Sequence, residues 1–204
     1  TAADGADVTI GAIDAEGASL TSVSLTASTT GSVITMSGLG LDSANITSIA
    51  AITGTAVSGA TVDIENIEAT TVGQLTFSGA GTFAADGTDM DITTLEMINA
   101  QNATGNVTIV MEALGSATIV NLGSGTNSYL ASTFADTINL ASAAGTDTII
   151  QNPSSSQNVI TVNNFTSGTD QIRLGDAALS AAGALIGGVT LDLVDGNAAS
   201  QGTA

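Results

Sequence analysis

The side chains that could do chemistry in this chain are almost all carboxylates. The 204 residues include 19 Asp and Glu, no His, no Cys and one basic residue, Arg173. The usual general bases, thiol nucleophiles, amines and soft metal ligands of enzymes are therefore missing. Carboxylates and backbone carbonyls are the ligands of hard cations such as Ca²⁺. The composition therefore favours a structural, calcium-binding protein over an enzyme.

One acidic cluster has the density of a cation-binding loop. Asp86, Asp89 and Asp91 lie close together in the sequence around Gly87. Ca²⁺ binds roughly six to eight oxygens, so we expect a turn here whose carboxylates hold one ion. The segment is not an EF-hand, because Met97 stands where the final Glu of that loop would be. The alternative is a solvated acidic turn.

A second acidic pattern occurs in the later part of the chain. Asp136, Asp147 and Asp170 each stand two residues before an Ile, and the last two follow Gly-Thr. We expect each Asp to end a turn and the following aliphatic residues to begin a strand. Such aspartates either bind calcium between stacked coils or cap their own turn.

Short aliphatic units recur in the first half of the chain. Each has an aliphatic residue, two polar or small residues and another aliphatic; they are Leu20–Leu25, Ile46–Ile52, Ile64–Ala69 and Ile92–Ile98. The spacing of three also fits a helix face, but the units are short, rich in Thr and Ile, and bounded by Gly and Asn, which favours strands. Alternating segments such as 32–36 and 106–110 follow them.

The recurrence of these units about every two dozen residues predicts an all-β fold, a β-solenoid resembling a parallel β-helix or β-roll with irregular coils. A β-sandwich is the alternative. We expect a single domain over 1–204, with irregular coils at 1–115 and Asp-x-Ile coils at 116–175. A C-terminal segment at 176–204 would cap the solenoid or serve secretion or assembly. It includes a short helix at 177–186 and a strand-like stretch at 189–194.

Three charged residues have expected orientations. Asp63 and Glu65 flank Ile64 in an alternating segment, so a strand would place both carboxylates outward and Ile64 in the core. The repulsion on such an acidic face is relieved by cations or by a neighbouring subunit. Arg173 should face outward and pair with a carboxylate, or be solvated.

Charge and composition also limit the partners. The net charge of −18 excludes nucleic acid and anionic membranes. Hydrophobic residues make up 43% of the chain, enough for a core, yet no apolar stretch is long enough to span a bilayer. The open ends of a solenoid favour self-association, so we expect the chain itself as partner, in a lattice or filament. The alternative is a surface adhesin or an ice- or glycan-binding module with a cell-surface glycan as ligand.

The segment from Ala135 to Leu174, above all Val162–Leu174, resembles the C-terminal region of bacterial surface-layer and repeats-in-toxin-related proteins exported by type I secretion. Residues 62–69 look like the degenerate coils of the same surface-layer solenoids. The resemblance implies a secreted, calcium-dependent, self-assembling protein of the bacterial cell surface, with an uncleaved C-terminal secretion signal. The family's Gly-Gly-x-Gly-x-Asp repeat is not intact here, since Gly145-Thr-Asp147 retains only its end.

Overall fold

The computed structural model describes residues 5–13, 17–39, 46–110, 114–141, 145–152, 160–174 and 191–194. These residues form strands and no helix. The first seven strands are β1 (Asp7–Ile13), β2 (Ser19–Leu20), β3 (Val23–Ala27), β4 (Val33–Leu39), β5 (Ile46–Ala56), β6 (Thr61–Gly79) and β7 (Thr82–Ala103). The later ones are β8 (Val107–Val110), β9 (Ile119–Asn121), β10 (Ser128–Leu130), β11 (Thr137–Asn139), β12 (Thr148–Gln151), β13 (Ile160–Asn163), β14 (Gln171–Leu174) and β15 (Leu191–Val194).

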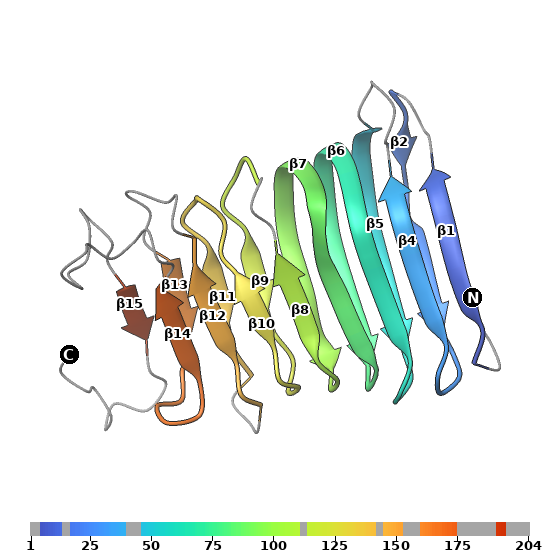
Figure 1. Cartoon of the computed structure of the whole chain (residues 1–204). Helices are drawn as coiled ribbons and strands as arrows, with labels where there is room; N and C mark the ends of the chain where they lie inside the picture. Colours follow the sequence, from blue (N-terminus) through green and yellow to red (C-terminus); the bar gives the residue numbers. More distant parts are fainter. Residues whose placement is uncertain are drawn as a thin grey trace.

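The strands wind into a parallel β-solenoid with two faces (Figure 1). The front sheet contains β1, β4, the first halves of β6 and β7, and then β8, β10, β12 and β14. The back sheet contains β2, β3, β5, the second halves of β6 and β7, and then β9, β11, β13 and β15. The solenoid prediction is confirmed, and the sandwich alternative is wrong because each coil pairs in parallel with the next.

Apolar side chains of successive coils stack into columns inside the solenoid. One front column consists of Ile10, Met36, Ile64, Ala85, Ile109, Tyr129, Ile149 and Ile172. A back column consists of Val23, Ile52, Leu75, Ile98, Val120, Ile138 and Val162. Most of these side chains are fully buried. Such ladders bury apolar surface between neighbouring coils, which is the main source of stability in a solenoid.

Aliphatic residues three positions apart, a spacing that also fits a helix, lie on bent strands in the structure. Ile46, Ile49 and Ile52 of β5 are buried, and two residues point outward between each pair. Ile49 and Ile52 stack on Val72 and Leu75 of the next coil. The strand therefore bends at these steps instead of alternating strictly, and the aliphatic units are strands, as predicted.

Four glycines stack at the turn that leads into the front sheet. They are Gly81, Gly105, Gly125 and Gly145, one in each of four consecutive coils. A Cβ on any of the last three would overlap the carbonyl oxygen of the preceding glycine in the stack. Only glycine lets the backbones of neighbouring coils approach this closely. The stack thus fixes the coil spacing at this turn.

Two expectations about the C-terminal segment have different outcomes. Strand β15 lies within the strand-like stretch predicted at 189–194 and pairs with β13. The helix expected at 177–186 lies outside the described residues.

Among the residues that are described, no helix is long and apolar enough to cross a membrane.

Candidate functional site

Buried Asn and Asp side chains that precede the front strands of three successive coils each bind the coil before their own. Asn127, Asp147 and Asp170 occupy the same position in these coils and are almost fully buried. Asn127 Oδ1 accepts the backbone N–H of Val107 at 3.1 Å, and Asp147 Oδ1 accepts that of Asn127 at 3.2 Å. Asp170 Oδ1 accepts the N–H of Asp147 at 3.1 Å. Each side chain therefore binds the backbone of the preceding coil; we call these three residues the polar ladder.

One member of the polar ladder, Asp147, has a raised pKa. Burial raises the pKa of Asp147 to about 6, and the nearby charge of Asp170 adds to the rise. Hydrogen bonds from Asn127, including one of 2.8 Å from Nδ2 to Asp147 Oδ1, oppose it by stabilising the carboxylate. Asp147 therefore titrates near pH 6 in the folded protein.

Asp136 is the centre of a second buried polar group. Its carboxylate is fully buried and accepts four hydrogen bonds. The donors are Thr118 N at 3.0 Å, Ser132 N at 2.8 Å, Ser132 Oγ at 2.9 Å and Tyr129 OH at 2.9 Å. Burial, followed by the charge of Asp136 and its hydrogen bond, raises the pKa of Tyr129 well above its ordinary value. The group ties the turn after β10 to the start of β9 in the preceding coil.

The three Asp-x-Ile motifs do not form one repeat. Asp136 precedes β11 of the back sheet, whereas Asp147 and Asp170 precede β12 and β14 of the front sheet. A separation of 11 residues is half a coil here, and the next separation, 23 residues, is a full coil. Each of the three Asp residues directly precedes a strand, as predicted.

The buried aspartates are engaged by hydrogen-bond donors. An N–H or O–H group points at both oxygens of Asp136 and of Asp170 and at Oδ1 of Asp147. A cation at these oxygens would face the same donor hydrogens, so the geometry fits backbone capping better than calcium binding. No group of three or more carboxylates among the described residues is placed to hold a metal ion.

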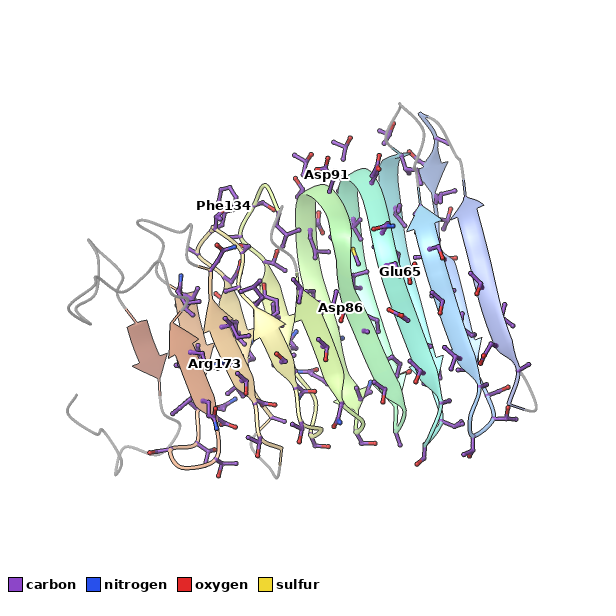
Figure 2. The ribbon with its side chains drawn as sticks, viewed as in Figure 1. Glu65, Asp86, Asp91, Phe134 and Arg173 are labelled. Carbon is purple, nitrogen blue, oxygen red and sulfur yellow. The ribbon has the colours of Figure 1, made fainter. Side chains whose placement is uncertain are left out.

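The acidic cluster at Asp86–Asp91 is not a turn, and this expectation was wrong. All six residues lie within the continuous strand β7. A bulge absorbs the extra residues, because Ile64 pairs with Ala85 whereas Asn66 pairs with Asp89. Asp86 and Asp91 are both exposed, and Figure 2 shows Asp86 on the front sheet and Asp91 at the bend between the sheets. The side chain of Asp89 lies outside the described residues.

The front sheet carries the expected acidic face near its first coils. Ile64 is buried, and Asp63 and Glu65 face outward on β6 beside Asp86 of β7. Burial raises the pKa of Asp63, and the charges of Asp86 and Glu65 raise it further. Asp63 Oδ1 is shielded from solvent and has no hydrogen-bond partner among the described residues. The cluster is thus mutually repulsive.

A row of stacked asparagines on the back sheet was not predicted. Asn139 Nδ2 donates to Asn121 Oδ1 at 2.7 Å, and Asn163 Nδ2 donates to Asn139 Oδ1 at 2.7 Å. The three residues are register partners on β9, β11 and β13. The signal in the sequence is one Asn at the end of each short strand, two residues after a Thr or Ile.

Comparison with known proteins adds no relative. No family model, curated protein or solved structure matches this chain. The inferences about function therefore depend on the geometry described above.

Proposed function

We propose that the chain is an extracellular structural protein of a bacterial surface, which self-assembles into a layer or filament. One observation carries the proposal: every buried carboxylate among the described residues binds backbone or side-chain groups of the solenoid itself. Enzymes direct their perturbed carboxylates into a cleft, where substrate meets them. Here Asp136, Asp147 and Asp170 hold coil to coil, which is what a rigid scaffold requires.

The surface charge supports a role for divalent cations in the assembly. Copies with a charge of −18 repel one another until the charge is screened or bridged. The exposed carboxylates Asp86 and Asp91 are accessible to cations, and Asp91 lies beside Glu68 of the preceding coil. We propose that calcium acts at such exposed carboxylates.

Light scattering during titration tests the proposal. We expect calcium to increase the particle size of the purified chain, with sodium chloride at matched ionic strength giving a smaller increase, and excess chelator to reverse it. Asp91→Asn combined with Glu68→Gln should raise the calcium concentration required, whereas Asp147→Asn should not. A chain that stays monomeric under all these conditions contradicts self-assembly, and equal effects of calcium and sodium contradict the calcium bridge.

A further inference from the structure

A row of five outward-facing residues crosses the front sheet from β7 to β14. In order, the row consists of Asp86, Val110, Leu130, Ile150 and Arg173, and we call it the front row. Leu130 pairs with Val110 and Ile150, and Ile150 pairs with Arg173. Asp86 follows Ala85, whose partner Ile109 precedes Val110. Figure 2 shows Asp86 and Arg173 on the same face of the solenoid.

The front row is acidic at one end, apolar in the middle and basic at the other end. Asp86 and Arg173 are exposed, and the three aliphatic residues between them are half-buried. Arg173 is the only basic residue of the whole chain. Strands lie about 4.8 Å apart, so the two charges are about 19 Å from each other along the row.

Among the described residues, β8, β10, β12 and β14 carry no outward carboxylate beside the front row, and Asp63 and Glu65 lie beyond its acidic end on β6. The outward residues beside it on β8, β10, β12 and β14 are Thr108, Ser128, Thr148 and Gln171. All four are uncharged and polar. In a chain with 19 carboxylates, a sheet face with apolar and hydroxyl side chains on three neighbouring strands, β8, β10 and β12, is suited to contact with another protein surface.

We propose that a second copy of this chain docks on the front row with its solenoid axis reversed. A two-fold axis parallel to the strands and passing by Leu130 places Leu130 opposite the Leu130 of the second copy. The same axis places Val110 opposite Ile150, and Asp86 opposite Arg173. The neighbouring row of hydroxyl residues also faces its counterpart, with Ser128 opposite Ser128 of the second copy and Thr108 opposite Thr148.

Charge decides the orientation of the two copies. With the axes reversed, each end of the row forms one Asp86–Arg173 pair between copies. With the axes in the same direction, Asp86 would face Asp86 and Arg173 would face Arg173, and both contacts would repel. The acidic residues Asp63 and Glu65 then lie beyond the matched row, away from their own counterparts.

This inference rests on the proposed function, because it supplies a lateral contact within the assembly. Charge reversal tests it by sedimentation equilibrium. We expect Arg173→Asp and Asp86→Arg each to raise the dimer Kd about tenfold or more, because the two-fold axis repeats each change in two contacts. The double variant should return the Kd to near that of the parent. Glu96→Arg is the matched control for Asp86→Arg, since it makes the same change in charge at an exposed position outside the row, on the back-sheet half of β7.

Cross-linking tests the register of the two copies. The chain has no Cys, so Leu130→Cys introduces a single thiol. We expect a short bifunctional thiol reagent to give covalent dimers of Leu130→Cys, and of Val110→Cys mixed with Ile150→Cys. Thr137→Cys, on the back sheet, should give none.

The outcomes separate this inference from the proposed function. If larger assemblies form while the charge reversals leave the Kd unchanged and Leu130→Cys does not cross-link, the front-row contact is wrong and self-assembly stands. If the parent is monomeric at every concentration, both are wrong. Cross-linking of Leu130→Cys to a thiol placed in residues 175–190 of the same chain would show that this segment covers the front row instead.

Discussion

Asp147 Oδ1 accepts a hydrogen bond of 2.8 Å from Nδ2 of Asn127, the residue at the same position one coil earlier. The position thus holds Asn in one coil and Asp in the next, and both side chains cap the N–H of the coil before them. An amide can do this without a charge, whereas buried Asp147 carries one above about pH 6.

Asp147→Asn should therefore stabilise the protein at high pH. The pKa of Asp147 is raised from 3.8 to about 6 by folding, so the folded protein binds this proton more tightly than the unfolded chain does. Acidification from pH 6 to pH 4 then stabilises the fold, and above pH 6 the buried charge costs up to about 3 kcal/mol. Urea denaturation should show a more stable variant at pH 8 and little difference at pH 4.

Asp91→Asn is the control for this measurement, because it removes one exposed carboxylate and so reports the general effect of net charge. If Asp147→Asn is less stable than the parent at pH 8, the carboxylate contributes more through its hydrogen bonds than its burial costs, and the interpretation fails.

Asp136→Ala should be strongly destabilising. It leaves the donors of Thr118, Ser132 and Tyr129 without their acceptor in a buried site. Loss of such a group costs about 3–5 kcal/mol, and Tyr129→Phe, which removes one donor, should cost about 1 kcal/mol. Urea titration of both variants and of the parent gives the free energies of unfolding that are compared. Equal small losses would show that the network contributes little.

Gly125→Ala should disrupt the turn that leads into β10. The added methyl group would overlap the carbonyl oxygen of Gly105, so neighbouring coils must separate at this point. We expect a loss of at least about 3 kcal/mol or failure to fold. Gly11→Ala is the control, because its Cβ would meet no atom within 4 Å. A Gly125→Ala protein with the parent's melting temperature would contradict the close approach of the coils.

Asn139→Ala should weaken the asparagine row at its centre. The change removes two hydrogen bonds of 2.7 Å, to Asn121 and from Asn163. We expect a loss of about 1–2 kcal/mol in the free energy of unfolding. Asn102→Ala, at an exposed position of β7, should cost less than about 0.5 kcal/mol. If both substitutions cost the same, the row does not stabilise the stack of coils.

The solenoid could be predicted from the sequence because the residues of its apolar columns recur at regular intervals. Ile46, Ile49 and Ile52 show the inward positions of a bent strand, and such positions recur once per coil. The cluster at Asp86 and Asp91 could not be placed in the same way. A glycine with neighbouring carboxylates is typical of a turn, but here Asp89, Met90 and Asp91 pair with β6 and keep the chain extended.

The polar ladder was only partly predictable. The pattern of Asp before an aliphatic residue marks Asp147 and Asp170 but not Asn127, which follows Gly-Thr in the same way. It also grouped Asp136 with them, although that residue lies half a coil away on the other sheet. Side chains of similar shape can replace one another in a capping role, so a pattern based on charge alone misses the amide member.

Electron microscopy of the purified chain can show directly whether it assembles. Images recorded with calcium should show regular layers or filaments, and images of the same sample after addition of excess chelator should show separate elongated particles. Separate particles in both conditions, over the range of protein concentrations in which the parent remains folded, would contradict a self-assembling structural role.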